Sequence, residues 1–180
     1  MAEEQKFENG DPFDLDKLFG EGKSEKPETE PLPGEESLPN KIEEREVKVV
    51  GVYEHPDAVG GQATPFVLLR DNKGRSVLIW IGRFEAASIS MAIEGIVVER
   101  PLTHDLIRNI IDKIGWKIER ILIDDLFNET YYAKITVVRN GDTMDIDSRP
   151  SDAIAIGLRV RAPIYMAETV LEQAAVNEDL

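Results

Sequence analysis

The chain contains no cysteine among its 180 residues, which excludes several kinds of site at once. Disulfide bonds, thiolate nucleophiles and cysteine-ligated zinc or iron–sulfur centres are all impossible. Histidine is also scarce, since His55 and His104 are the only two. A metal site would therefore rest on oxygen ligands with at most two imidazoles. The lack of cysteine favours an intracellular protein.

Long apolar runs are missing as well. No segment approaches the roughly 20 apolar residues that a membrane-spanning helix needs. The N-terminus, MAEEQKFENGDPFD, is acidic, whereas a signal peptide begins with a basic and then an apolar segment. We therefore expect a cytoplasmic protein that does not associate with membranes.

Basic residues are too few to balance the acidic ones, and the net charge is −14. Residues 1–46 hold 6 Lys or Arg against 15 Asp or Glu, and the remainder holds 15 against 20. Most of the excess charge therefore lies in the N-terminal leader. The remaining domain still offers no broad basic face, so phosphate binding would depend on local arginines or bound cations.

The chain divides by composition into a leader and a single domain. Residues 1–45 are acidic and contain several prolines and glycines, so we predict that they are disordered. Residues 46–175 form the predicted domain, and 176–180 a short tail. The hydrophobic content of 42% suits one domain with a substantial core.

Local patterns predict the elements of this domain. Strands are expected at 46–54, 65–71, 76–82, 117–126 and within 130–147, and helices at 83–99 (ended by Gly95), 103–114, 149–160 and 167–176, with a short extended segment at 162–166. Asn140-Gly141 is typical of a type I′ hairpin turn. The order βββ-αα-βββ-α-(β)-α predicts an α+β fold, with a mixed or antiparallel sheet and about four helices.

Two of the expected helices have informative patterns. In the first, Leu106, Ile107, Ile110, Ile111 and Ile114 recur at helical spacing, with Thr103 as the expected N-cap and Gly115 as the stop. In the helix at 149–160, apolar residues leave little polar face, which predicts burial on several sides.

No standard catalytic signature is present: the sequence lacks a phosphate-binding glycine-rich loop, a G-x-S-x-G motif and an H-E-x-x-H motif. The most suggestive cluster is Arg100, Thr103, His104 and Asp105, at a predicted helix N-terminus that could hold an anion. A purely structural role is the alternative, in which Asp105 complements the helix dipole and His104 is simply exposed.

A second Arg-Pro helix start carries Arg149 and Asp152, with Asp145 and Asp147 just before it. If the two strand aspartates share a face, they could converge with Asp152 on a divalent cation. A solvated acidic hairpin end is the alternative. Glu85, at another helix start, allows the same two interpretations.

The two tryptophans, Trp80 and Trp116, lie within or beside apolar runs. Their positions favour packing in the core or in an interface over stacking on nucleobases.

Three segments, IWIGRFEAASISMAIEG, RPLTHDLIRNII and SRPSDAIAIGLRVRAPIYM, resemble the bifunctional nuclease family in their order and spacing. That domain was long classed as one of unknown function in bacteria and archaea, and it occurs in plant proteins described as having ribonuclease and deoxyribonuclease activity. The resemblance covers roughly Val47 to Ala175. The positions that match the family motifs are Glu85, Arg100, Thr103, His104, Asp105, Arg149, Ser151 and Asp152.

The resemblance implies a nuclease acting on RNA and DNA. In this hypothesis Mg²⁺ or Mn²⁺ is held by Asp105, Asp147 and Asp152, with Glu85, His104, Asp105 and Asp152 as catalytic candidates and Arg100 and Arg149 as phosphate ligands. No organic cofactor is expected. The alternative hypothesis is a non-enzymatic interaction or regulatory module that forms a homodimer, in which the arginines pair with Asp105 and Asp152 to hold the helix starts.

Overall fold

A computed structural model describes residues 43–56 and 63–176. Residues 1–42 of the predicted leader and 57–62 of the 55–64 connection lie outside the described residues, whereas Glu44 and Arg45, which the prediction assigned to the leader, begin the first strand. The elements are β1 (Glu44–His55), β2 (Thr64–Asp71), β3 (Ser76–Trp80), α2 (Arg83–Glu94), α3 (Thr103–Lys113), β4 (Lys117–Phe127), β5 (Thr130–Arg139), β6 (Asp142–Ser148), α4 (Pro150–Val160), β7 (Ile164–Ala167), α5 (Glu168–Ala174) and β8 (Ala175–Val176). None of the helices in these ranges is long and apolar enough to cross a membrane.

The described strands form one eight-stranded sheet in the order β6-β5-β4-β7-β1-β2-β3-β8. All neighbours run antiparallel except β4 and β7, which pair in parallel. With four helices in the described ranges, the predicted mixed α+β fold is confirmed. The predicted turn at Asn140-Gly141 is also confirmed, because both residues have positive φ angles, of 51° and 94°.

The C-terminal prediction needs a correction. Helix α5 ends at Ala174, and Ala175 and Val176 pair with Val77 and Ser76 at the free edge of β3. Alanine favours a helix in isolation, but hydrogen bonding to an open sheet edge outweighs that preference here.

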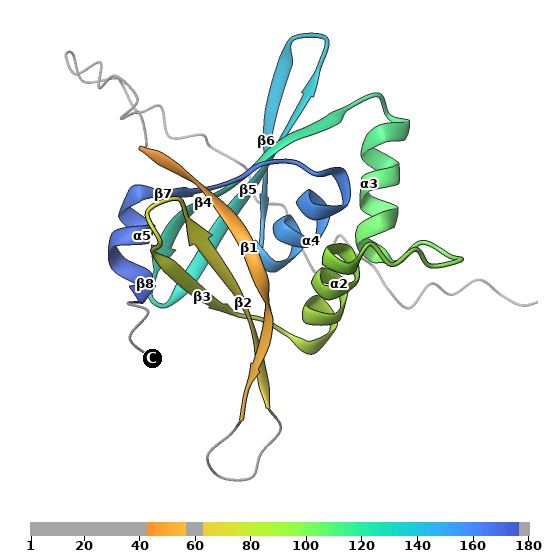
Figure 1. Ribbon diagram of the computed structural model, residues 1–180. Coiled ribbons are helices and arrows are strands. Elements are labelled where there is room, and N and C mark those ends of the chain that lie inside the picture. Colours follow the sequence, from red (N-terminus) through yellow and green to blue (C-terminus); the bar gives the residue numbers. More distant parts are fainter. Residues whose placement is uncertain (1–42, 57–62, 177–180) are drawn as a thin grey trace, which may run out of the picture. The chain divides into compact units, whose positions relative to one another are not determined.

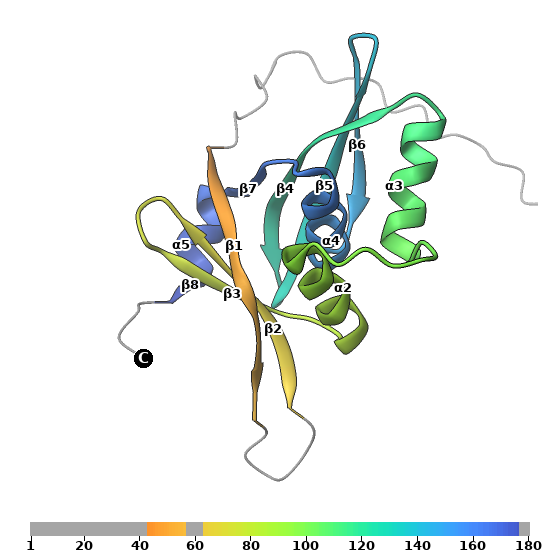
Figure 2. The same ribbon diagram turned by 45° about the vertical axis from the view of Figure 1, so that its right-hand side comes forward.

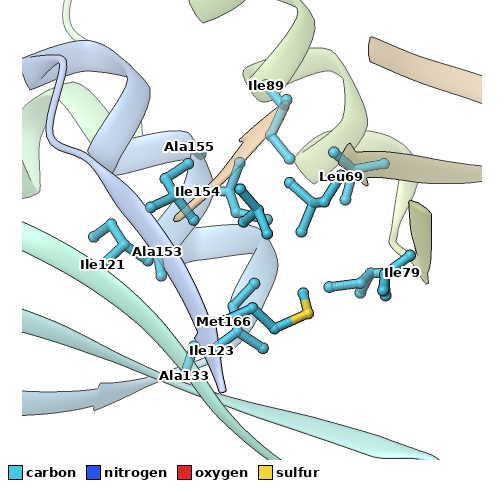
Figure 3. Packing of buried hydrophobic residues seen from close by; sticks show 14 of the residues in the cluster. Leu69, Ile79, Ile89, Ile121, Ile123, Ala133, Ala153, Ile154, Ala155 and Met166 are labelled. Carbon is cyan, nitrogen blue, oxygen red and sulfur yellow. The ribbon is translucent and has the colours of Figure 1, made fainter. Parts of the chain in front are cut away.

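Helix α4 lies between the sheet and the helices α2 and α3 (Figures 1 and 2). Its residues Ala153 to Gly157 are all buried, which confirms the predicted burial on several sides. Figure 3 shows Ala153, Ile154 and Ala155 among isoleucines of the sheet. Gly157 allows the closest approach, since a Cβ atom there would lie only 2.7 Å from Cγ1 of Ile121.

Helix α3 divides its predicted apolar stripe between the core and the surface. Ile107 and Ile111 are partly buried and pack against the core. Leu106, Ile110 and Ile114 remain 50%, 50% and 59% exposed. These three side chains therefore form an exposed apolar row on the surface of the described residues.

Charged side chains attach the start of α5 to the sheet. The carboxylate of Glu168 accepts hydrogen bonds from Arg75 at 2.8 and 3.1 Å and from Arg45 at 2.8 Å. Arg75 also donates to the fully covered carboxylate of Asp71. Hydrogen bonds from Arg75 and then Arg45 lower the pKa of Glu168 to about 2.

This depressed pKa predicts how stability depends on pH. Glu168 has an ordinary value of 4.5, so its charged form stabilises the folded protein fully above pH 4.5, and the effect is lost as the pH falls towards about 2. The difference in free energy of unfolding between the wild type and Glu168→Gln should therefore shrink over this range, as measured by urea denaturation. Glu172→Gln, an exposed change on the same helix, is the control. A wild-type advantage that persists unchanged at pH 2 would contradict the assignment.

Candidate functional site

The N-terminal parts of three helices meet around His104. Glu85 and Ser88 belong to the first two turns of α2, His104 lies in the first turn of α3, and Asp152 lies in the first turn of α4. Arg149 is the N-cap of α4, and Pro150 is its first helical residue, one position after the predicted start. The two Arg-Pro segments of the sequence therefore lead into helices whose starts face each other.

The start of α3 differs from the prediction by one position. Leu102, in an extended conformation, is the N-cap, and its N–H donates a 3.1 Å hydrogen bond to Oδ2 of Asp105. Thr103 is the first helical residue, so the prediction that it caps the helix is wrong. The carboxylate of Asp105, at the third helical position, makes the half of a capping box in which the N3 side chain accepts from the N-cap N–H.

His104 connects the other two helices through its imidazole ring. Its Nδ1 lies 2.8 Å from Oγ of Ser88, and its Nε2 lies 3.0 Å from Oδ1 of Asp152. The Ser88 oxygen also accepts a hydrogen bond of 3.0 Å from Arg159. In neutral His104 this network assigns the ring proton to Nε2, because Ser88 can then donate to Nδ1 and Nε2–H can donate to Asp152.

A hydroxyl, an imidazole and a carboxylate in a row are also the parts of a hydrolytic triad, but Ser88 is badly placed to be a nucleophile. The residue is only 6% exposed and its oxygen already accepts from Arg159. Its role in this arrangement is to orient His104. The imidazole of His104 connects Ser88 to the carboxylate of Asp152, and Asp152 in turn binds the guanidinium of Arg149.

Arg149 joins Asp152 to Glu85 on the outside of the cluster. Its Nε donates to Oδ2 of Asp152 at 2.8 Å, and its Nη2 donates to Oε1 of Glu85 at 2.9 Å. Burial opposes ionisation of Asp152, but the hydrogen bonds from Arg149 and His104 outweigh it and hold the pKa of Asp152 below its usual value. The Arg149 side chain is 67% exposed, so a ligand can reach it.

Arg159 lies on the buried side of the cluster. Its guanidinium donates to Oδ1 of Asp105 at 2.7 Å, to Oγ of Ser88 and to the carbonyl oxygens of Ser88 and Ala155. Its side chain is only 8% exposed. Burial opposes ionisation of Asp105, but the bond from Arg159 lowers the pKa of that carboxyl. Asp105 is therefore occupied in holding α3 against α4.

A pocket of about 700 Å³ opens beside the histidine. It is lined by Phe84, Glu85, Ala87, Ser88, Met91, Pro101, Leu102, Thr103, His104, Arg149 and Asp152. Its wall combines an exposed guanidinium with a carboxylate and an imidazole, beside apolar side chains. Such a wall can bind an anion and exchange a proton with it or with water.

The structure brings together Glu85, His104, Arg149 and Asp152 but not the other predicted site residues. Asp105 lies next to His104 in sequence but binds Arg159 instead. Arg100 is exposed and does not line the pocket.

The proposed metal ligands also lie apart. Asp145 and Asp147 do share a face of β6, opposite Thr136 and Lys134. The core residues Ala133 and Ile135 lie on the other face of β5, towards α4, so the two aspartates point away from Asp152. Within the described part of the chain, no three acidic or histidine side chains form a metal-binding group.

Two members of the cluster, Ser88 and Arg159, are absent from the sequence-based candidates. Arg159 was detectable in principle, because a charged residue within an otherwise apolar and buried helix requires a buried partner. Ser88 follows Glu85 by three residues and therefore lies on the same helix face. A serine in a helix does not by itself indicate a functional role, so Ser88 could not have been selected by residue type.

Comparisons with known proteins agree with the resemblance seen in the sequence. The family model described as "Bifunctional nuclease domain" matches residues 67–179. Uncharacterised proteins from two strains of Mycobacterium tuberculosis are each 44% identical over 133 residues, covering 73% of this chain and 76% of theirs.

Plant relatives carry a functional name. The "Bifunctional nuclease 2" proteins of Oryza sativa subsp. japonica and Arabidopsis thaliana are 31% and 28% identical, over 57% and 56% of this chain. The matches cover 33% and 32% of those plant proteins. The similarity therefore concerns about a third of each plant protein.

Substitution of the buried Arg159 and of the exposed Arg149 should have very different effects on the free energy of unfolding. Arg159→Met leaves Asp105 with its charge but without its buried partner, and should lower the free energy of unfolding by about 3 kcal/mol. Arg149→Met removes two ion pairs of an exposed guanidinium and should cost less than about 1 kcal/mol. Urea denaturation of both variants is the measurement, and equal losses would refute this division of roles.

Proposed function

The chain belongs to the bifunctional nuclease domain family, and on that basis we propose that it hydrolyses phosphodiester bonds of RNA and DNA in the pocket beside His104. The observation that carries the proposal is the connected group of Arg149, Asp152 and His104 in the pocket wall. This group combines a phosphate ligand with a proton acceptor, the two parts that hydrolysis of an anionic ester needs.

Arg149 is the proposed phosphate ligand. Its exposed guanidinium already binds two carboxylates, Glu85 and Asp152, so it is oriented for a second anion with the same planar geometry. Since the protein is acidic overall, this local cation has to supply the attraction.

Asp152 is the proposed proton acceptor. Oδ1 accepts from both His104 and Arg149, while Oδ2 accepts from Arg149. When the guanidinium turns to a phosphate, Oδ2 is freed and Asp152 becomes more basic, because one cause of its low pKa is removed. Oδ2 can then take a proton from water as the water oxygen bonds to phosphorus. The phosphorus–oxygen bond to the leaving nucleotide breaks, and solvent protonates that oxygen.

The dependence on Mg²⁺ or Mn²⁺ stays a prediction. The acidic groups closest to the pocket, Glu85 and Asp152, both bind Arg149, so a cation would have to displace its guanidinium. The described residues do not provide a ready set of three acidic ligands, and the steps above use none. The cytoplasmic location also stays a prediction.

The nuclease proposal predicts the effect of two substitutions. His104→Ala and Asp152→Asn should each lower kcat/KM by roughly 10²- to 10⁴-fold, because they remove the proton-transfer pair. The measurement is cleavage of labelled RNA and single-stranded DNA, with added Mg²⁺, with Mn²⁺ and with EDTA. Asp112→Asn, an exposed change on α3, is the matched control. Full cleavage by both variants would reject this site, and an inactive wild type under every condition would reject the function.

A homodimeric interaction module is the second proposal, and the outer row of α3 favours it. Leu106, Ile110 and Ile114 are spaced by four residues and at least half exposed. Such a row can pair with its own copy in an antiparallel, two-fold symmetric contact. We propose a second copy of the chain as its partner.

This dimer is tested by one charge placed in the row. Ile110→Lys should convert a dimer to a monomer at micromolar concentration in sedimentation equilibrium, because the lysine ammonium would be buried at the symmetric contact. Met144→Lys changes a comparably exposed apolar residue on β6 and should leave the dimer intact. A wild type that sediments as a monomer would exclude the proposal.

A further inference from the structure

Three aromatic side chains form a ladder across β1, β2 and β3. Tyr53 pairs with Phe66, and Phe66 pairs with Trp80, so their positions are in register on three neighbouring strands. The Tyr53 and Phe66 rings are stacked with centroids 5.7 Å apart, and Phe66 meets Trp80 edge-on at 5.2 Å. The ring of His55 approaches Trp80 at 6.0 Å.

The ladder lies on the sheet face that points away from the core. Val67 and Ile79, which alternate with Phe66 and Trp80, are buried in the core. Trp80 is instead 54% exposed and Tyr53 45% exposed, so Trp80 does not pack in the core, and its other predicted role, packing in an interface, stays a prediction. Large aromatic rings held side by side and half open to solvent are unusual for a surface without a ligand.

The backbone of β1 at Gly51 leaves room for the Tyr53 ring of the ladder. A Cβ atom at Gly51 would lie 3.0 Å from the hydroxyl oxygen and 3.1 Å from ring carbons of Tyr53. Glycine at this position, beside an irregularity in the β1–β2 register, lets the tyrosine ring lie against the strand. The ring is therefore placed by close packing on one side and remains accessible on the other.

Trp80 extends the ladder to the candidate site. It lines a second pocket, of about 410 Å³, together with Tyr131, Arg149 and Ser151. Arg149 is among the lining residues of both this pocket and the His104 pocket. A chain of nucleotides with one phosphate at Arg149 can place neighbouring bases towards Trp80.

We propose that the Tyr53–Phe66–Trp80 ladder is a base-stacking surface that selects single-stranded nucleic acid. This inference rests on the proposed function and names its substrate class. Stacking on aromatic rings requires bases whose faces are free, which single strands offer and a duplex does not. Stacking tolerates any base, so the surface suits an enzyme acting on both RNA and DNA.

The charges around the ladder favour a nucleic acid strand, with its phosphates, over a second protein as the ligand of this surface. Arg83 begins α2 three residues after Trp80, is exposed, and donates to the carbonyl oxygen of Ala63 at 3.1 Å. Arg149 belongs, like Trp80, to the lining of the pocket of about 410 Å³. The same lining contains one acidic residue, Glu129, whose negative charge repels phosphates and so reduces the attraction due to the arginines. The resulting attraction is local and should weaken as salt is added.

The test uses the two tryptophans. Trp116→Phe leaves Trp80 as the only tryptophan, and His104→Ala in the same chain prevents cleavage during a titration. Binding of a ten-nucleotide oligothymidylate should quench Trp80 fluorescence. By anisotropy of a labelled oligonucleotide, Trp80→Leu should raise Kd by roughly 5- to 140-fold, whereas Trp80→Tyr, which keeps an aromatic face, should restore most of the affinity.

Tyr132→Leu is the matched control, because Tyr132 is 43% exposed but lies outside the ladder and the pocket. Tyr53→Leu is an independent variant on another strand, should Trp80→Leu fail to fold by circular dichroism. A duplex of the same length should bind at least about tenfold more weakly than the single strand, since its bases are already stacked.

The failure of this inference can be told from failure of the nuclease proposal. The binding titration in the His104→Ala chain does not depend on cleavage. With wild-type His104, Trp80→Leu should slow cleavage of an oligonucleotide by raising KM, whereas Tyr132→Leu should leave cleavage unchanged. Equal affinity of the leucine, tyrosine and parent chains would overturn the ladder as a base-binding surface, whether or not the protein cleaves. Dissociation of a dimer by Trp80→Leu would overturn it in favour of a second copy.

Discussion

The buried guanidinium of Arg159 constrains the arrangement of the whole site. Helix α4 is packed into the core, so this charge cannot reach bulk water and must find its partners inside the protein. It finds them on α2 and α3, through Ser88 and Asp105. The three helices are thereby held in one relative position, and His104 is placed between Ser88 and Asp152 as a consequence.

The site illustrates how an acidic protein can attract an anion. The described charges do not form a broad basic field, but Arg149 stands exposed at the junction of two pockets. Its partners in the structure are Glu85 and Asp152, whose charges compensate it, and in the proposed function a phosphate competes with them. The proposed function and the proposed base-stacking surface are linked in this way, because both assign affinity to local geometry and to stacking on Trp80 and not to net charge.

Much of the fold was predictable because its signals are local. Apolar spacing located α3, the Asn140-Gly141 pair located a hairpin, and the apolar sequence of α4 indicated burial. The candidate site was predictable only in part. Glu85, His104, Arg149 and Asp152 do meet, whereas Asp147 points to the other face of the sheet, because strand alternation and the position of α4 together exclude it.

By itself, the sequence determined the family, the order of the elements and the helix starts at which charged residues gather, since these depend on short-range pattern and on residue type. Only the tertiary structure decided which charges meet. Arg159 and Ser88 became partners of Asp105 and His104 through the packing of three helices, and Trp80 became exposed through the pairing of three strands. Contacts between residues 16 to 71 positions apart depend on that packing, and no local pattern encodes them.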